Sequence, residues 1–314
     1  MKLEIERLCK KYGNMVALEN FSITMEEGVY GLLGPNGAGK STIMNLLTDN
    51  LKRTDGNILF DGKEIISMGK EYREILGYVP QQQGFYEHFS AEVFLKYIGK
   101  LKGCTNKDLN NQIPELLKAL NLYEKRFEKI GSFSGGMKQR ILIAQALLGN
   151  PKIIIMDEPT AGVDPQERIH IRNFISQIAK NRIILIATHI VSDIESIAKE
   201  ILLIKKGKMI EKGTTCELIE KIQPYVYEIE VDDQQQKDLP DKYLVSNIRQ
   251  NAEGLIVKII SKEPPKEYFR FIPRDRTDAC SALSAAGSPT GASYRFSKIT
   301  SETPLTAFTD STAP

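Results

Sequence analysis

The sequence predicts an α/β fold in which a mainly parallel sheet is flanked by helices. Two runs, KIIIMDE at 152–158 and RIILIATH at 182–189, are almost wholly apolar. Apolar residues on both faces of a strand mean burial from both sides, as in a parallel sheet between helices. A helical pattern over roughly 166–179 separates the two runs and provides the crossover that parallel neighbours require.

The first eighty residues read mainly as short strands. The runs predicted to be extended are residues 2–8, 21–25, 26–34, 55–65 and 75–81. The fourth of these indicates a hairpin with Asp61 and Gly62 at its turn. A glycine-rich loop and a helix over 41–51 interrupt the series, so a strand–loop–helix unit is expected near the N-terminus.

A mainly helical region follows, from about residue 87 to residue 148. AEVFLKYIGKLKG at 91–103 and IPELLKALNLYEK at 113–125 both place apolar residues three and four positions apart. A third helix follows the turn SFSGG. Its apolar residues are expected on one face and are Met137, Ile141, Ala144 and Leu148.

The C-terminal part has a different composition. Short β-like runs between 216 and 272 predict a small appended sheet. After Pro273 the residues are dominated by Ser, Thr, Ala and Pro, and we expect a disordered tail. A change of reading frame near the natural end would also produce this shift.

Charge and hydropathy narrow the classes of function. The 314 residues include 42 basic and 40 acidic ones, for a net charge of +2, which argues against a dedicated nucleic-acid surface. The N-terminal residues alternate charge with apolar side chains, so no signal peptide is expected. The apolar runs fall far short of the ~20 residues of a membrane helix. A role at a membrane therefore requires a partner.

The loop GPNGAGKST fits the pattern G-x-x-x-x-G-K-[ST] of a phosphate-binding loop. Glycines let backbone N–H groups point at phosphate oxygens, and the following helix adds the positive end of its dipole. Lys40 is predicted to bridge the β- and γ-phosphates, and Ser41 to bind Mg²⁺. The alternative, an ordinary glycine turn, is disfavoured by the strand before the loop and the helix after it. The residues predicted to bind nucleotide here are Gly34, Pro35, Asn36, Gly37, Ala38, Gly39, Lys40, Ser41 and Thr42.

Polar residues end the strands that neighbour this loop in the predicted sheet. Ligands of such sheets bind at the carboxyl ends of the strands. Asp157 is therefore expected near Mg²⁺, and Glu158 can act as the general base that orients the attacking water. His189 is predicted to contact the γ-phosphate, although a lone histidine is more often structural. Gln81, at the end of another strand, can ligate Mg²⁺ through its amide oxygen.

A second glycine turn, SFSGGMKQR at 132–140, also precedes a helix. Six motifs now occur in a fixed order: GPNGAGKST, YVPQ, FSGGM, IIIMDEP, AGVD and ATH. Over roughly residues 1–220 the chain resembles the ATP-binding cassette (ABC) ATPase family. The resemblance implies a P-loop NTPase fold of ABC type, with an antiparallel β subdomain and a helical subdomain at about 87–150. A small α+β appendage at 221–272 and the low-complexity segment 273–314 complete the expected organisation.

The resemblance also explains the second glycine turn. In this family two cassettes pack head to tail around two ATP molecules with Mg²⁺, and the SGG turn of one closes over the γ-phosphate held by the other. Ser134, Gly135 and Gly136 match that turn, and Asp164 matches the loop that links the two sites. Tyr12 matches the aromatic residue that stacks on adenine.

Other matches concern catalysis. Glu158 and His189 match the catalytic glutamate and the switch histidine, and Gln81 matches the glutamine that couples Mg²⁺ to the partner's movement. The chain departs from the usual LSGGQ signature at Phe133 and Met137 but keeps its Ser-Gly-Gly centre. The form FSGGMKQR, together with PQQQGFYEHFSAEVF and THIVSDIE, looks like cassettes of bacterial exporters for peptides, antibiotics and other drugs.

The expected function is therefore an ATPase subunit that drives a separately encoded, multi-span membrane permease, at the cytoplasmic face of the membrane. Because all motifs are complete, a second copy of the chain is the expected ATPase partner. An ABC ATPase that acts on ribosomes or nucleic acid is the first alternative, disfavoured by the single set of motifs and the balanced charge. A module that binds ATP without hydrolysis is the second, disfavoured by Glu158 and His189.

Overall fold

The computed structural model describes residues 1–81, 84–222, 226–231, 243–250, 255–261 and 270–271, which form two compact units. The first unit comprises Met1–Thr188 and Asp193–Lys212, and the second comprises His189–Ser192 and the chain from Gly213 onward. Among the described residues, no helix combines the length and the apolar character needed to cross a membrane.

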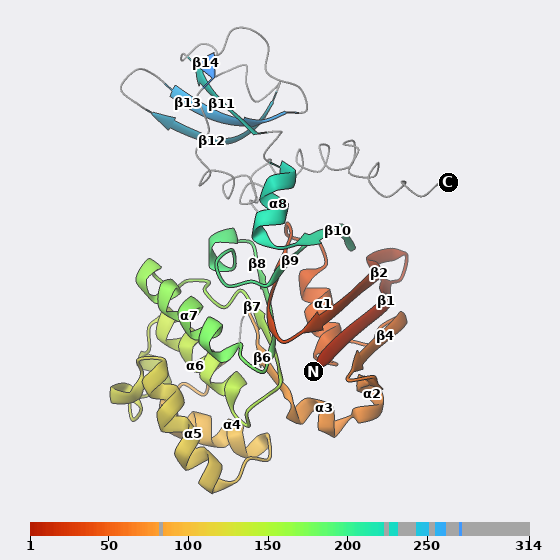
Figure 1. Ribbon diagram of the computed structural model, residues 1–314. Coiled ribbons are helices and arrows are strands. Elements are labelled where there is room, and N and C mark those ends of the chain that lie inside the picture. Colours follow the sequence, from red (N-terminus) through yellow and green to blue (C-terminus); the bar gives the residue numbers. More distant parts are fainter. Residues whose placement is uncertain (82–83, 223–225, 232–242, 251–254, 262–269, 272–314) are drawn as a thin grey trace. The chain divides into compact units, whose positions relative to one another are not determined.

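The first unit is built around a six-stranded sheet with the order β10-β9-β3-β8-β7-β6 (Figure 1). Adjacent strands from β9 through β3, β8 and β7 to β6 are parallel, which confirms the predicted fold class. The strands are β3 (Gly28–Leu33), β6 (Leu76–Val79), β7 (Ile153–Asp157), β8 (Ile183–Thr188), β9 (Glu200–Lys205) and β10 (Lys208–Gly213). Every residue of β7 and β8 is buried, as their continuous apolar sequence predicts.

A second sheet has the order β2-β1-β4-β5, and its neighbouring strands are antiparallel. Its strands are β1 (Lys2–Tyr12), β2 (Met15–Glu26), β4 (Asp55–Phe60) and β5 (Lys63–Glu64). The β4–β5 pair confirms the predicted hairpin around Asp61 and Gly62. β1 and β2 extend beyond the runs 2–8 and 21–25 that the alternating pattern predicts. They continue up to a tight turn at Gly13, which has a φ of 56°.

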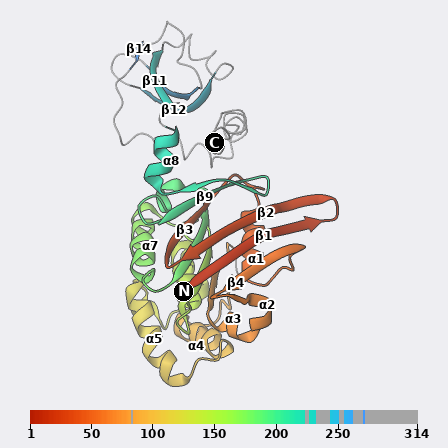
Figure 2. The same ribbon diagram turned by 45° about the vertical axis from the view of Figure 1, so that its right-hand side comes forward.

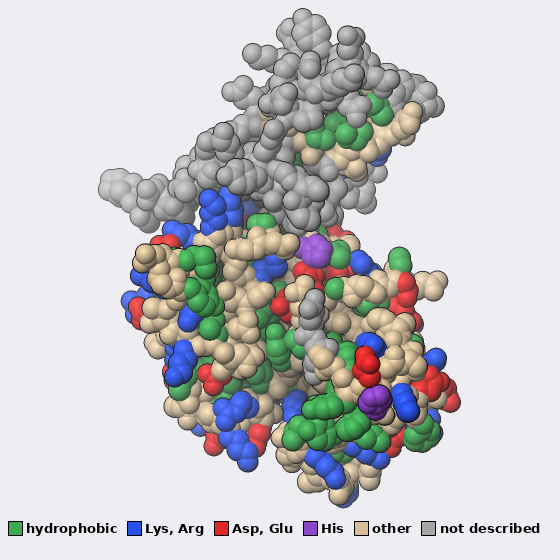
Figure 3. All heavy atoms as spheres, turned by 180° about the vertical axis from the view of Figure 1, so that it is seen from behind, with side chains coloured by type: hydrophobic (Ala, Val, Ile, Leu, Met, Phe, Trp, Pro, Cys, Tyr) green, Lys and Arg blue, Asp and Glu red, His purple; other side chains and the backbone are tan. Residues whose placement is uncertain are grey.

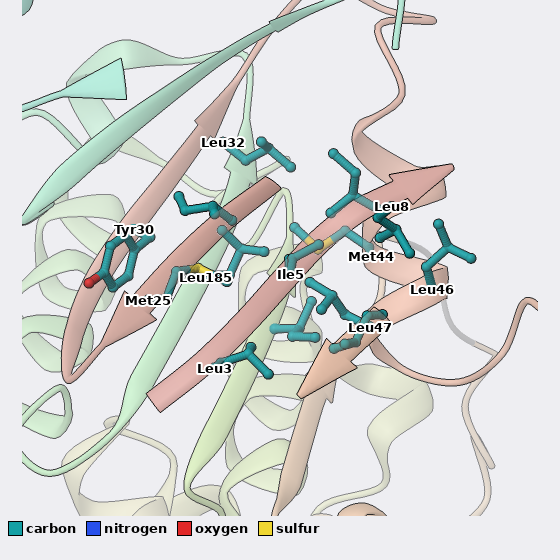
Figure 4. Packing of buried hydrophobic residues seen from close by; sticks show 14 of the residues in the cluster. Leu3, Ile5, Leu8, Met25, Tyr30, Leu32, Met44, Leu46, Leu47 and Leu185 are labelled. Atoms are coloured by element: carbon teal, nitrogen blue, oxygen red, sulfur yellow. The ribbon is translucent and has the colours of Figure 1, made fainter. Parts of the chain in front are cut away.

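The helix α1 (Lys40–Leu47) is buried between the two sheets, and its contacts fix the start of the helix. Figure 4 shows apolar side chains of β1, α1 and the central strands gathered into one core, with Leu3, Ile5, Leu8, Met44 and Leu47 among them. Burying one such leucine stabilises the fold by about 1.5–3 kcal/mol. The position of Lys40 thus depends on the core of the first unit.

The remaining helices of the first unit gather largely on the other side of the parallel sheet. Figures 1 and 2 both place α4, α5, α6 and α7 there, away from α1 and the antiparallel sheet. The helices are α2 (Ile65–Met68), α3 (Lys70–Glu74), α4 (Ala91–Leu101), α5 (Asn106–Ala119), α6 (Gly135–Leu147) and α7 (Pro165–Ile178), with short 3₁₀ turns η1 (Tyr123–Lys125) and η2 (Ile130–Ser132). A third 3₁₀ turn, η3 (Val191–Asp193), has its first two residues in the second unit.

The expectation of a single apolar face on α6 was wrong. Every residue from Gln139 to Leu147 is buried, and Leu148 lies just beyond the helix. The reason is that α6 packs against β6 and is also covered by α4 and α5. A helix enclosed on all sides needs no polar face.

The second unit contains a four-stranded sheet with the order β12-β13-β11-β14. Its elements are α8 (Thr215–Ile222), β11 (Val226–Val231), β12 (Leu244–Gln250), β13 (Leu255–Ile260) and β14 (Arg270–Phe271). Ile229, Val231, Val257 and Ile259 form its core. The expected sheet is present, and it is preceded by a helix, α8, that the sequence analysis did not predict. The expected domain limits at 220 and 272 stay predictions, and 273–314 lies outside the described residues.

Hydrogen bonds at Thr214 explain the helix that the sequence analysis missed. The hydroxyl of Thr214 accepts from the amide of Glu217, and the Glu217 carboxylate accepts from the amide of Thr214 at 2.8 Å. This reciprocal pair is a capping box, which starts a helix. The sequence TTCE carried that signal.

Candidate functional site

The predicted site residues lie at the carboxyl ends of parallel strands, at one edge of the sheet. In register, Leu33 of β3 lies opposite Thr188 of β8, and Ala187 of β8 lies opposite Asp157 of β7. The loop at 34–39, Glu158 and the segment after Thr188 therefore all leave the sheet at the same edge. This is the place where α/β sheets bind their ligands.

Two glycines give the loop its shape. Gly37 and Gly39 have φ values of 77° and 109°, which side-chain-bearing residues rarely adopt. A Cβ atom on Gly39 would also lie 3.0 Å from the backbone oxygen of Ala17. Gly39 is the N-cap of α1 and supplies no side-chain cap, so the first-turn amides of the helix have no intrahelical acceptor. Such amides form an anion site.

Lys40 lies inside this loop with only 8% of its surface exposed. Its Nζ atom donates hydrogen bonds to the backbone oxygens of Gly34 at 2.6 Å and Pro35 at 3.2 Å. Burial lowers the pKa of Lys40, and the carboxylates of Glu158 and Asp157 oppose that shift. A buried ammonium group held by two neutral carbonyls is suited to exchange them for phosphate oxygens.

Asp157 ends β7 and is 6% exposed. Burial is the main cause that raises its pKa, and Glu158 adds to the rise, whereas Lys40 and a hydrogen bond with Ser41 lower it. A hydroxyl oxygen beside a carboxylate is the hard-oxygen donor set that Mg²⁺ binds, with waters and phosphates as its other ligands. The residues present therefore fit Mg²⁺. The described residues contain no group of three His, Cys, Asp or Glu side chains able to hold a metal on their own.

Glu158 has a left-handed backbone with a φ of 51°, and its side chain is 6% exposed. Its amide donates to the Ala187 oxygen at 2.8 Å. Its Oε2 accepts a hydrogen bond of 3.1 Å from the hydroxyl of Thr188, which is fully buried. The neighbouring strand β8 thus binds both the backbone amide and the side-chain carboxylate of Glu158. Left-handed conformations of non-glycine residues concentrate at functional sites.

The other predicted residues of this edge range from exposed, as are Tyr12, Gln81 and His189, to buried. Tyr12 is 44% exposed at the β1–β2 turn, with Lys10 Nζ 4.9 Å from the centre of its ring. Gln81 follows β6 by two residues, and His189 follows Thr188 directly and begins the segment grouped with the second unit. Asn36, Gly37 and Ser41 of the loop are exposed, Gly34 and Ala38 are buried, and Pro35, Gly39 and Thr42 are half-buried.

The second glycine turn forms a separate group of residues. Ser134 and Gly135 are exposed, and the Ser134 hydroxyl caps α6 by accepting from the Met137 amide at 3.3 Å. Cβ atoms on Gly135 and Gly136 would lie 3.7 Å from Gly162 and Val163, so the turn lies beside the AGVD loop. Figures 1 and 2 place the helix that it begins, α6, across the parallel sheet from α1.

Asp164 ends the AGVD loop, and its exposed side chain caps α7 by accepting from the Glu167 amide at 3.0 Å. An ion pair of 3.2 Å between Arg140 and Glu167 joins the second turn of α6 to the first turn of α7. The structure therefore brings Lys40, Ser41, Asp157 and Glu158 together, and it gathers the signature turn with Asp164 in another place.

Sequence reasoning missed three polar residues beside Glu158. They are Thr188, which donates to Glu158, and the buried pair Thr160 and Asp193, in which the threonine hydroxyl donates to the carboxylate. Thr188 stood inside the motif ATH, and Thr160 directly follows the motif IIIMDEP. Only the three-dimensional contacts reveal what they bind.

Known proteins resemble the chain over this region. Residues 18–161 match the family model described as ABC transporter. The chain is 36% identical over 247 residues to the ABC transporter ATP-binding protein YxlF of Bacillus subtilis, covering 78% of this chain and 82% of that protein. It is 36% identical over 208 residues to the bacitracin transport ATP-binding protein BcrA of Bacillus licheniformis, covering 65% and 67%. It is 32% identical over 220 residues to the Nod factor export ATP-binding protein I of Cupriavidus metallidurans, covering 69% and 73%.

Solved structures agree with these sequences. A structure of the ATP-binding subunit of an ABC transporter superposes with a TM-score of 0.65 at 26% identity, covering 71% of this chain and 94% of that one. The match takes in nearly the whole of that subunit and agrees with the sheets and helices described above. The chain belongs to the ABC transporter family and is one of its ATP-binding proteins.

Proposed function

We propose that the chain hydrolyses ATP as one of two cassettes that drive a separate membrane permease, and that the transport is export. The observation that carries this proposal is the separation of the two glycine turns. Lys40, Ser41, Asp157 and Glu158 converge at the sheet edge, whereas Ser134 and Gly135 belong to an exposed turn beside the AGVD loop. A second copy would complete each nucleotide site by supplying that turn.

In the proposed cycle, the first-turn amides of α1 and the ammonium group of Lys40 bind the phosphates of ATP, and Tyr12 stacks on adenine. Ser41 and Asp157 would hold Mg²⁺, with Gln81 adding its amide oxygen, and the ion would neutralise phosphate charge when bound. Glu158 accepts a proton from the water whose oxygen attacks the γ-phosphorus. The bond from that phosphorus to the bridging oxygen breaks, and ADP leaves.

His189 and the partner cassette complete the proposed site. The imidazole of His189 contacts the γ-phosphate, while Ser134, Gly135 and Gly136 of one copy donate to the phosphate held by the other. Asp164 lies in the loop that joins the two sites across the dimer. Loss of the γ-phosphate removes charge that both copies had satisfied, so the interface opens.

The permease is proposed to dock on an aromatic cluster at the start of α4. Figure 3 shows hydrophobic side chains gathered on this part of the surface. Tyr86 is 51% exposed and stacks on Phe89 at 5.2 Å between ring centres, and Tyr97 meets both at 5.5 and 6.0 Å. Phe94, which lies in the same segment, is fully buried and belongs to the core. Exposed aromatic groups of this kind mark interfaces.

The proposed direction of transport and the proposed location of the chain are supported by the similar proteins. One relative is named for bacitracin transport and another for Nod factor export, and their matches cover 65% and 69% of this chain. An exporter cassette works at the cytoplasmic face of the membrane, bound there by its permease. Co-purification with a multi-span membrane protein supports this role, whereas co-sedimentation with ribosomes would replace it by the alternative.

The test compares the wild type with Glu158→Gln and with the double variant Glu158→Gln, Ser134→Arg. The Glu158→Gln protein is expected to bind Mg-ATP, to turn over at least ~100-fold more slowly and to sediment as a dimer, in the presence of its permease where required. The double variant is expected to bind ATP as a monomer. An undiminished rate in Glu158→Gln would remove Glu158 from catalysis, and a dimer of the double variant would remove the signature turn from the interface.

A further inference from the structure

Two loops that leave neighbouring strands exchange buried hydrogen bonds. One loop follows β7 and contains Glu158 and Thr160, and the other follows β8 and ends at Asp193. Thr188 donates to the Glu158 carboxylate at 3.1 Å, and Thr160 donates to the Asp193 carboxylate. The loop after β7 thus contributes the donor Thr160 and the acceptor Glu158. The donor Thr188, which is the last residue of β8, and the acceptor Asp193, at the end of the following loop, stand on the other side. We refer to these two hydrogen bonds, and to the four side chains that make them, as the crossed pair.

All four side chains of the crossed pair are out of solvent. Thr188 and Thr160 are 0% and 2% exposed, and Asp193 and Glu158 are 5% and 6% exposed. A carboxylate that loses its donor in such surroundings cannot replace it readily with water. The two bonds therefore hold the loops more firmly than solvent-exposed bonds would.

The crossed pair encloses His189 along the chain. Thr188 precedes this residue directly, and Asp193 follows it by four positions. Both ends of the segment are bonded to the loop that carries Glu158, one to Glu158 itself and one to the residue two positions later. A shift of either loop is thereby transmitted to the other.

From this juxtaposition we propose that Thr160 and Thr188 are positioning residues, which tie the two residues flanking the His189 segment, Thr188 and Asp193, to the Glu158 loop for catalysis. The proposal rests on the function proposed above. Neither threonine needs to touch the phosphate. Thr160 acts through Asp193, and Thr188 acts through Glu158.

Substitution by valine or by serine distinguishes the effect of the threonine hydroxyl from the effect of the side-chain volume. Thr160→Val and Thr188→Val keep the volume and lose the donor, whereas Thr160→Ser and Thr188→Ser keep the donor. Thr48 offers a matched control, because its hydroxyl is also buried and donates to the Met44 oxygen at 3.0 Å, at the far end of α1. Thr48→Val measures the cost of losing a buried threonine bond outside the site.

Steady-state turnover and the affinity for a fluorescent ATP analogue are measured on the full chain. The two valine variants are expected to lose about 10- to 100-fold in kcat, as misplaced groups do, while KM and the affinity change less than about threefold. The serine variants and Thr48→Val are expected to stay within a few-fold of the wild type. Equal kcat values for Thr160→Val and Thr48→Val would overturn the proposal, as would parallel losses of kcat, affinity and melting temperature.

A second measurement needs no hydrolysis. The chain has three histidines, so the ring carbon signal of His189 can be assigned with His189→Gln, and His88 and His170 serve as internal references. Thr160→Val is expected to shift or broaden the His189 signal alone, and Thr48→Val to leave it in place. An unchanged His189 signal would overturn the proposal even if the wild type proved inactive, an outcome that would separately refute the proposed ATPase function.

Discussion

Lys40 donates from Nζ to the backbone oxygen of Gly34 at 2.6 Å, so the phosphate-binding loop closes on its own ammonium group. The group is removed from water, and burial lowers its pKa. The Gly34 and Pro35 oxygens that accept from this group are neutral, and the carboxylates of Glu158 and Asp157 oppose the shift of its pKa. Phosphate oxygens would be stronger acceptors than the carbonyls they replace.

Lys40→Ala is expected to weaken the binding of Mg-ATP. The loss of a charge-assisted hydrogen bond costs about 1.5–3 kcal/mol, which corresponds to roughly 10- to 150-fold in Kd. Isothermal titration or a fluorescent analogue measures the effect, and Lys100→Ala on the exposed last turn of α4 is the control. Equal affinities of the two variants would show that Lys40 does not bind the phosphates.

Asp157→Asn is expected to stabilise the nucleotide-free protein at neutral pH. Because burial raises the pKa of Asp157, the native state holds its proton more tightly than the unfolded chain does. The charged carboxylate therefore destabilises the fold above the ordinary aspartate pKa of about 3.9, and the penalty disappears as the pH falls through this range. The advantage of Asp157→Asn over the wild type should accordingly shrink between pH 7 and about pH 4.

Urea unfolding at the two pH values measures this difference. A gain of about 1 kcal/mol would raise the melting temperature by about 2–4 °C. Exposed Asp49 provides the control, since Asp49→Asn should change stability by less than about 0.5 kcal/mol. A wild type that is more stable than Asp157→Asn at pH 7 without Mg²⁺ would contradict the electrostatic account.

Two inactive variants are expected to restore activity when they are mixed. In a dimer of Lys40→Ala with Ser134→Arg, one site combines the intact Lys40 of one copy with the intact Ser134 of the other. Each variant alone has no complete site. ATP turnover is measured over a series of mixing ratios, with the permease present where the dimer requires it. If the turnover of every mixture equalled the weighted mean of the two variants measured alone, the result would indicate that Lys40 and Ser134 of one chain act in the same site.

Tyr86→Glu is expected to abolish co-purification with the permease while ATP binding is retained. Docking of the permease would bury the new carboxylate among aromatic rings, and removing a charge from water without a partner is unfavourable. Leu101→Glu is the matched control, because Leu101 is 68% exposed at the end of the same helix region. If the Tyr86→Glu protein still bound the permease and supported transport, the docking surface would lie elsewhere.

Sequence patterns predicted the parts of the fold that depend on neighbours in the chain. The apolar runs of β7 and β8 imposed burial on both faces, and the loop at 34–42 required its glycines for local backbone reasons. The crossed pair could not be predicted, since Thr160 and Asp193 are 33 positions apart and meet only when β7 and β8 lie side by side. The enclosure of α6 likewise depends on partners from three different elements.

The capping bond of Ser134 has a consequence for which side chains can serve at that position. The hydroxyl oxygen accepts the Met137 amide with a lone pair, and its O–H remains a donor. One atom group can thus begin a helix and face an anion at the same time. Aspartate would begin α6 equally well but would repel that anion, and alanine would do neither. If Ser134 faces a phosphate as proposed, the helix start at residue 134 is restricted to a small hydroxylated residue, whatever the rest of the turn becomes.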